Sequence, residues 1–145
     1  MPTPPEGYRY HTFLQIRYGD LDTLGHVNNS RFLTYLEQAR VTYFRDREMW
    51  DGQLSSTGLI VAKITVEYEL PLRVEDGGVD VWTRVARLGN KSFTMEHIIA
   101  RQADGAVAGT SEIVMVTYDY DSEQTIAIPQ PWRDLIIDYE PALSA

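Results

Sequence analysis

The densest group of reactive side chains in this chain lies between residues 17 and 29. Asp20 and Asp22 stand close together there, and carboxylates serve enzymes as general acids, general bases and nucleophiles. If this stretch is extended, the two side chains point the same way and each disfavours ionisation of the other. The segment is therefore a candidate acid–base site.

The same residue types also fit a purely structural role or a calcium loop. Asp, Asn and Gly between a strand and a helix commonly cap the helix and turn the chain. Asp20, Asp22 and Gly25 match the first, third and sixth positions of an EF-hand loop. However, Leu24 falls where an oxygen ligand belongs, and Arg31 falls where the bidentate Glu belongs. This pattern excludes a calcium loop, whereas capping and acid–base chemistry both stay open.

A metal site at His26 is not expected. The chain has three His residues and no Cys, and His11, His26 and His97 show none of the short ligand spacings typical of metal sites. The absence of Cys also excludes a disulfide framework, a thiolate cluster and a Cys nucleophile. We therefore expect no metal and no cofactor of the protein's own.

The candidate site runs directly into a predicted helix. Residues 30–50 contain no Gly or Pro, and their apolar side chains recur near helical spacing. These positions are Phe32, Tyr35, Leu36, Ala39, Tyr43 and Trp50, with Leu33, Val41 and Phe44 widening the stripe. Asn28, Asn29 or Ser30 can supply the N-cap, and residues 51–52 (Asp-Gly) end the helix. Such a broad stripe predicts a curved sheet around the helix. The free N–H groups at the start of the helix could stabilise the oxyanion of an acyl transfer carried out by a nearby carboxylate.

Most of the remaining chain has the pattern of β-strands. Alternating apolar and polar residues predict strands, and Gly-Asn and Asp-Gly pairs predict hairpins between them. The expected strands are residues 12–18, 62–70, 79–88, 91–102 and 107–120, followed by a short amphipathic turn or helix at 132–139. One long helix and a run of antiparallel strands predict an α+β fold, with the sheet packed on the helix.

Length and charge limit the functional classes. The chain has 145 residues, 13 Lys and Arg against 21 Asp and Glu, and a formal net charge of −8. That length predicts one domain over residues 1–145, with a loose tail at 1–7. The acidic balance argues against a nucleic-acid partner, and no apolar run approaches the roughly 20 residues that a membrane-spanning helix needs. Because the N-terminus lacks the basic and apolar regions of a signal peptide, we expect a cytoplasmic protein with no membrane partner.

One segment resembles a known family. Residues 15–40 have the sequence QIRYGDLDTLGHVNNSRFLTYLEQAR. This segment resembles the hotdog-fold acyl-CoA thioesterases of the 4-hydroxybenzoyl-CoA thioesterase type, and its His-Val-Asn-Asn run is similar to the core of plant acyl-carrier-protein thioesterases. The resemblance implies a hotdog fold, in which a five-stranded antiparallel sheet wraps a long central helix. It also implies a homodimer or homotetramer, with sheets joined edge to edge and active sites at the subunit boundary.

The resemblance further implies roles for residues of this segment. Asp22 matches the catalytic carboxylate, which acts as a nucleophile or as a general base toward water, and His26 matches a second catalytic residue. Leu24 departs from the acyl-carrier-protein branch, which has a polar Asn there, and this departure favours Asp22 acting largely alone. A backbone N–H group facing the thioester oxygen is expected at Gly25, Val27 or Asn28.

The resulting hypothesis is an acyl-CoA thioesterase, with CoA present as part of the substrate. Tyr35 is expected in the core or lining the acyl pocket. A cationic hairpin formed by Arg87, Lys91 and Ser92 could bind CoA phosphates. A non-catalytic acyl-CoA or lipid-binding module is the alternative, and a hotdog hydratase is a third. The net charge of −8 disfavours acidic acyl-carrier proteins as partners.

Overall fold

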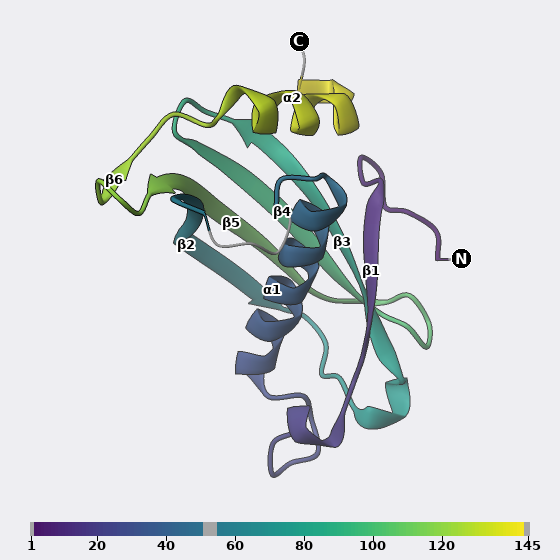
Figure 1. Ribbon diagram of the computed structural model, residues 1–145. Helices are drawn as coiled ribbons and strands as arrows, with labels where there is room; N and C mark the ends of the chain where they lie inside the picture. Colours follow the sequence, from purple (N-terminus) through teal and green to yellow (C-terminus); the bar gives the residue numbers. More distant parts are fainter. Residues whose placement is uncertain (1, 51–54, 144–145) are drawn as a thin grey trace.

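The computed structural model describes residues 2–50 and 55–143, and one long helix lies across an antiparallel sheet (Figure 1). The strands pair in the order β1–β3–β4–β5–β2, and a short β6 pairs with β5. Their bounds are β1 Tyr10–Gln15, β2 Thr57–Tyr68, β3 Gly78–Leu88, β4 Ser92–Arg101, β5 Val107–Asp119 and β6 Gln124–Thr125. The helices are α1 Asn29–Asp46 and α2 Gln130–Tyr139, with 3₁₀ turns at Tyr18–Asp20, Val74–Asp76 and Pro141–Leu143. The predicted α+β architecture with five long strands is confirmed, and β6 is an addition that the sequence did not predict.

α1 begins where the sequence predicts and ends earlier. Asn28 is the N-cap, and its side-chain oxygen accepts a hydrogen bond from the backbone N–H two residues further on, at 2.9 Å. The helix ends at Asp46, and Glu48 then turns the chain with a φ of 61°, in the left-handed region. The prediction of a helix reaching about Trp50 is therefore wrong at its C-terminal end. The predicted stop at 51–52 lies outside the described residues.

The core lies between α1 and the side of the sheet that faces it. Alternate residues of β3, β4 and β5 are buried there, as the period of a strand requires. They include Val79, Val81, Val85, Phe93, Met95, Ile99, Ile113 and Met115. From α1, the buried side chains are Phe32, Tyr35, Leu36, Ala39, Arg40, Tyr43 and Phe44. Burial of each large apolar side chain contributes about 1.5–3 kcal/mol, so this layer fixes α1 against the sheet.

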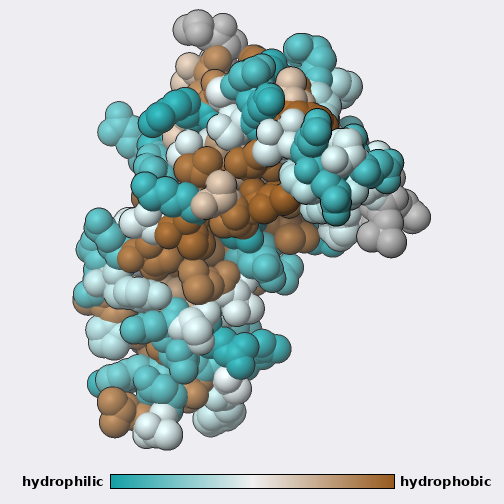
Figure 2. Space-filling view, turned by 90° about the vertical axis from the view of Figure 1, so that its left-hand side faces the viewer, coloured by the Kyte–Doolittle hydropathy of each residue, from teal (hydrophilic) through white to brown (hydrophobic). Residues whose placement is uncertain are grey.

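One flank of α1 and most of β2 stay uncovered in this chain. Leu33 on the helix is 41% exposed, although the sequence predicts a sheet wrapped around it. On β2, the side chains of Ile60, Val61 and Ile64 are 38–40% exposed. β2 is the last strand of the sheet order, so its outer edge has no neighbour within the described chain. Figure 2 shows apolar side chains gathered across the middle of this face of the molecule.

The two ends of the sheet carry different features (Figure 1). At one end, the loop between β1 and α1 is tied down by the Val27 N–H, which donates to the Leu72 carbonyl at 2.7 Å. At the other end, α2 lies over the β3–β4 hairpin, and Arg133 donates to the Gly89 carbonyl at 2.7 Å. The candidate site therefore lies at the end of the sheet remote from α2.

Neither described helix is long and apolar enough to cross a membrane.

Candidate active site

Asp20 is a buried structural carboxylate. The 3₁₀ turn at Tyr18–Asp20 ends the extended stretch, and the Asp20 side chain turns inward, where the residue is 1% exposed. Its Oδ2 atom accepts hydrogen bonds from the Tyr35 hydroxyl at 2.7 Å and from the Arg17 backbone N–H at 3.0 Å. Burial by itself raises the pKa of Asp20, but these hydrogen bonds and the charges of Arg17 and Arg31 outweigh it and lower that pKa below its ordinary value. Asp20 is therefore ionised at neutral pH and holds the loop to the helix.

Asp22, unlike Asp20, is exposed to solvent. Its Oδ1 atom accepts the backbone N–H groups of Leu24 at 2.9 Å and of His26 at 3.2 Å. Its Oδ2 atom and the half-buried His26 ring have no hydrogen-bond partner among the described residues. The expectation that Asp22 disfavours ionisation of Asp20 is wrong, because the pKa of Asp20 is lowered and the 3₁₀ turn places the two carboxylates in different environments. Asp22 thus shapes its own turn with one oxygen and keeps the other free.

Three backbone N–H groups of this loop are already occupied. Those of Gly25, Val27 and Asn28 each donate to a backbone carbonyl of this chain, at 2.7–3.1 Å. These bonds close the turn and tie the loop to its neighbours. An N–H already bonded within the protein is a poor donor to a ligand, so these bonds count against the expectation that one of the three groups faces a thioester oxygen.

The first N–H group of α1 remains available. Between residues 22 and 30, only the N–H groups of Thr23 and Asn29 have no acceptor in the described part of the chain. The Asn29 carbonyl is held by the Tyr68 hydroxyl at 3.1 Å, which fixes the orientation of this residue. Unpaired N–H groups and the positive end of the helix dipole coincide at such a position. Asn29 is therefore a donor that the sequence analysis missed, although its helix N-cap was predicted.

Tyr35 lies inside the core. The residue is 5% exposed, and its hydroxyl is committed to Asp20. Burial and this hydrogen bond raise the pKa of Tyr35 well above its ordinary value. Of the two expectations for this side chain, the structure supports a core position. The hydroxyl holds Asp20, and with it the loop, to α1 (a bracing role), so a substrate contact through that hydroxyl is not supported.

The cationic hairpin lies far from Asp22 within one chain. Gly78, at the start of β3, pairs with the end of β1 near the candidate site, whereas Arg87, Lys91 and Ser92 surround the far end of the same strand (Figure 1). β3 has 11 residues, and a strand rises about 3.3 Å per residue. The hairpin and Asp22 are thus separated by most of the length of the sheet, and a single chain does not bring them together.

A cavity of about 740 Å³ lies beside the C-terminal half of α1. Its apolar lining comprises Val41, Phe44, Met49, Trp50, Leu59, Val61, Met115 and Trp132. The lining also includes Arg40, which is only 8% exposed. Sequence analysis missed this feature, although a charged residue on the apolar stripe, between Leu36 and Tyr43, is a signal that could have found it. Asp22 does not line this cavity.

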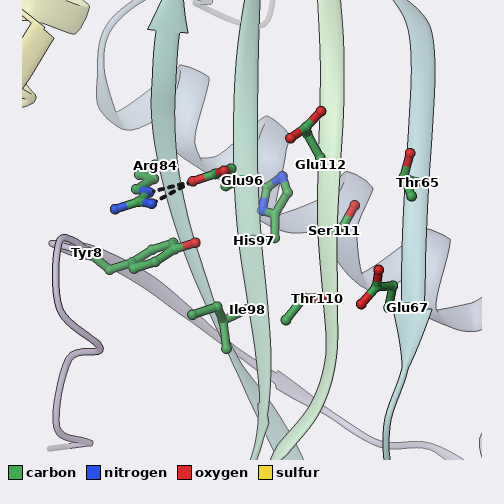
Figure 3. A pocket seen from close by; sticks show the side chains of 10 residues that line it. All are labelled: Tyr8, Thr65, Glu67, Arg84, Glu96, His97, Ile98, Thr110, Ser111 and Glu112. Carbon is green, nitrogen blue, oxygen red and sulfur yellow. Dashed lines mark hydrogen bonds and ion pairs between the residues drawn. The ribbon is translucent and has the colours of Figure 1, made fainter.

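A second, shallower groove of about 490 Å³ lies on the face of the sheet away from α1 (Figure 3). Arg84 crosses it and donates to Glu96 Oε1 through Nε at 2.8 Å and Nη2 at 2.6 Å. The guanidinium of Arg84 also stacks 4.5 Å from the ring of Tyr8, which anchors the chain just after the predicted loose tail. In the described ranges, no group of three or more His, Cys, Asp or Glu side chains is placed to hold a metal ion. This groove is therefore a structural contact for the N-terminal segment, and Asp22 does not line it.

Comparison with known proteins decides the family. The family model of the Thioesterase-like superfamily matches residues 16–136. The chain belongs to this superfamily. It is 26% identical over 133 residues to the long-chain acyl-CoA thioesterase FadM of Escherichia coli (strain K12), a match that covers 85% of this chain and 93% of that protein.

Solved structures of thioesterases share the fold of this superfamily member. A thioesterase from Thermus thermophilus, complexed with coenzyme A and Zn, has a TM-score of 0.79 and 30% identity, over 94% of this chain and 98% of that chain. The PA5185 protein from Pseudomonas aeruginosa strain PAO1 has a TM-score of 0.83 and 28% identity, over 92% of each chain. These matches confirm the predicted hotdog fold and the predicted class, a thioester hydrolase.

Proposed function

We propose that this chain hydrolyses acyl-CoA thioesters with Asp22 as the catalytic carboxylate. The observation that carries the proposal is the free Oδ2 atom of Asp22, held beside the start of α1 by a turn that uses only Oδ1. FadM of Escherichia coli, a long-chain acyl-CoA thioesterase by name, and the thioesterase with bound coenzyme A support the substrate class. CoA enters as part of the substrate, with no further cofactor. The cytoplasm stays the predicted location.

The proposed reaction needs one carboxylate and one good donor. Asp22 either deprotonates a water that attacks the thioester carbon or attacks that carbon itself, in which case water then hydrolyses the resulting anhydride. In both routes a carbon–oxygen bond forms, the carbon–sulfur bond breaks, and the CoA thiolate leaves and takes up a proton. The His26 ring, in the same turn and with no partner in the described chain, is the proposed second catalytic residue and can supply or accept that proton.

We assign the oxyanion donor to the Asn29 backbone N–H. This group opens α1 and has no acceptor among the residues described, and the carbonyl of the same residue accepts a hydrogen bond from the Tyr68 hydroxyl. A pre-oriented donor of this kind contributes about 10²–10³ in rate to an acyl transfer. The assignment replaces the three neighbouring N–H groups, whose hydrogen bonds leave them unsuited to the role.

We further infer that two copies join along β2. The uncovered apolar face of β2 and α1 (Figure 2) and the open edge of β2 both suit a two-fold, antiparallel strand pairing. Thr57 lies at the cavity end of β2, and Tyr68 lies at the end beside Asn29. Antiparallel pairing sets the Tyr68 end of one copy against the Thr57 end of the other. Asp22 of each copy would then lie next to the cavity of the second copy, which completes a site that neither chain forms alone.

A non-catalytic acyl-CoA-binding module is the second candidate. The observation in its favour is that Asp22 Oδ1 caps its own turn and that Asp22 lines neither the cavity beside α1 nor the groove at Arg84. Under this alternative, the carboxylate is architectural, and the cavity beside α1 binds an acyl group without cleaving it.

Release of free CoA thiol from acyl-CoA substrates tests the proposal, with Asp22→Asn as the main variant. Asn keeps an oxygen for the Leu24 and His26 N–H groups, so the turn persists while the charge is lost. The matched control is Asp104→Asn, because Asp104 Oδ1 likewise accepts a backbone N–H two residues further on, in an exposed turn. We expect Asp22→Asn to lower kcat by about 10²–10⁴ and Asp104→Asn to leave it unchanged.

Two results would overturn the catalytic proposal. Retention of more than about a tenth of wild-type kcat by a folded Asp22→Asn variant would remove Asp22 from the chemistry, given the size of general-base effects. Binding of acyl-CoA by the wild-type protein without thiol release, across short and long acyl chains, would favour the non-catalytic module.

A further inference from the structure

Arg40 is a buried cation that has no ion pair within residues 2–50 and 55–143. It is 8% exposed, lies on the sheet-facing side of α1 and lines the cavity of about 740 Å³. Its guanidinium has no hydrogen bond or ion pair to any described residue, although an Arg offers five N–H donors. Burial lowers the pKa of Arg40, with the charge of Glu37 opposing the effect, yet a guanidinium stays protonated in proteins. A full positive charge therefore lies at the wall of an otherwise largely apolar cavity.

Two other buried polar atoms of the same layer lack partners. His97 Nε2 and Ser111 Oγ have no hydrogen bond to any residue that the structure describes, and the two residues pair directly across β4 and β5 beneath α1, although neither lines the cavity. Burial first, and then the charge of Arg40, lower the pKa of His97 to about 3, so Arg40 reaches this layer and His97 is neutral. Buried polar groups are normally hydrogen-bonded, and a buried charge is normally paired. Within the lining of the cavity, Arg40 is thus the side chain suited to bind a group that accepts hydrogen bonds and carries negative charge.

We propose that the cavity binds acyl groups whose end remote from the thioester carries a carboxylate, and that Arg40 binds this carboxylate. The inference rests on the proposed thioesterase function, because the carboxylate is a part of the acyl group of the substrate. The aromatic and aliphatic walls contact the methylene chain, and the guanidinium fork binds the carboxylate through two parallel hydrogen bonds. Arg40 is then a specificity-determining residue of the site.

The charges around the cavity favour a carboxylate over a CoA phosphate. Glu37 and Glu48 also line the cavity, and both are exposed to solvent. Water and salt screen exposed charges, whereas a buried charge acts at a lower effective dielectric. A doubly charged phosphate would meet the two carboxylates at the exposed rim, and it would leave the apolar wall without a matching ligand. A single carboxylate on an apolar chain can pair with the Arg40 guanidinium while its methylene groups pack against the apolar wall.

Thiol release from matched pairs of substrates tests the inference. Each pair consists of an acyl-CoA and the ω-carboxyacyl-CoA with the same number of carbons, from short to long chains. We expect wild-type kcat/KM to favour the carboxylated partner at the chain length that spans from the thioester to Arg40. We expect Arg40→Met to lower the ratio of kcat/KM values within that pair by about 30-fold or more, the usual scale for truncating one partner of a buried charge pair.

Control variants separate this role from folding. Arg40→Lys keeps the charge without the fork and should restore part of the ratio, and Arg45→Met, an exposed Arg on the same helix, should leave the ratio unchanged. If Arg40→Met does not fold, the wild-type protein still decides the matter, because octanoate should raise its thermal unfolding midpoint more than the uncharged 1-octanol does.

The outcomes distinguish this inference from the proposed function. Hydrolysis of plain acyl-CoA with no preference for the carboxylated partner at any chain length would overturn the role of Arg40 and leave the thioesterase intact. A ratio that Arg40→Met does not change would do the same. Hydrolysis of neither substrate by the wild-type protein would overturn the proposed function itself.

Discussion

Replacing Tyr35 with Phe tests whether the loop that carries Asp22 is held from inside the core. The Tyr35 hydroxyl donates at 2.7 Å to Asp20, a residue that is 1% exposed. A hydrogen bond to a charged group contributes about 1.5–3 kcal/mol, and water cannot easily replace it at a buried site. We therefore expect Tyr35→Phe to lower the free energy of unfolding by about 1.5–3 kcal/mol and the thermal midpoint by roughly 3–12 °C.

The size of this loss depends on the charge of Asp20. The pKa of Asp20 is lower in the folded chain than its ordinary value, despite burial, because of its hydrogen bonds and the two nearby Arg charges. Its ionised form therefore stabilises the fold fully above the unfolded pKa, and this stabilisation is lost as the pH falls through the folded pKa. Denaturant unfolding should show the largest effect of Tyr35→Phe near neutral pH and a smaller one in acid. In a double-mutant cycle, Asp20→Asn should change the effect of Tyr35→Phe by more than about 0.5 kcal/mol.

Tyr18→Phe is the matched control. Tyr18 is 81% exposed and belongs to the same loop, so its hydroxyl should contribute less than about 0.5 kcal/mol to stability. A Tyr35→Phe variant no less stable than Tyr18→Phe would refute the bracing role. A raised KM for acyl-CoA at unchanged stability would instead place the Tyr35 hydroxyl in the acyl pocket.

Two further variants test the buried layer and the β2 edge. Burial lowers the pKa of His97 from 6.5 to about 3, so the unfolded chain binds the proton first and stability should fall as the pH drops from about 6.5 to 3. His97→Gln should flatten that part of the curve of unfolding free energy against pH, and an unchanged slope would count against a buried, neutral His97. Ile64→Lys, at a β2 position 38% exposed in one chain, should yield a folded monomer by sedimentation and abolish thiol release, whereas Val107→Lys, equally exposed on β5, should do neither. A dimer that survives Ile64→Lys would refute pairing along β2.

Local sequence signals predicted the elements of the fold well. The cap at Asn28, the absence of Gly and Pro from residues 30–50, and strict apolar alternation each act within a few residues of the chain. They located α1 and the long strands to within a few positions, and the Gly89–Asn90 turn located the β3–β4 hairpin. The early end of α1 was missed because Glu48, which is not a Gly, adopts the left-handed conformation there.

The catalytic roles of the candidate site residues stay a prediction, and their geometry could not be predicted from the sequence alone. The sequence predicted that the side chains of Asp20 and Asp22 point the same way, but the 3₁₀ turn at Tyr18–Asp20 places them in different environments. Side chains two residues apart share a face only while a strand stays extended. One occupied N–H group of the loop, that of Val27, donates to the carbonyl of Leu72, a residue far away in sequence. The exposure of β2 could not be predicted, because alternation shows which side chains share a face but does not reveal that the strand lies at an edge.

The broad apolar stripe of α1, the exposed side chains of β2 and the separation of Asp22 from the cavity share one explanation. A stripe that extends past the sheet, to Leu33 on the open flank, lacks a cover within the chain. An edge strand with Ile60 and Ile64 partly exposed invites pairing with another strand, which folded proteins normally prevent. If a second copy covers both, the same contact sets Asp22 beside an apolar cavity. Stability of the dimer and catalysis would then depend on one surface, so both should weaken together on dilution, with kcat per chain falling as the dimer dissociates.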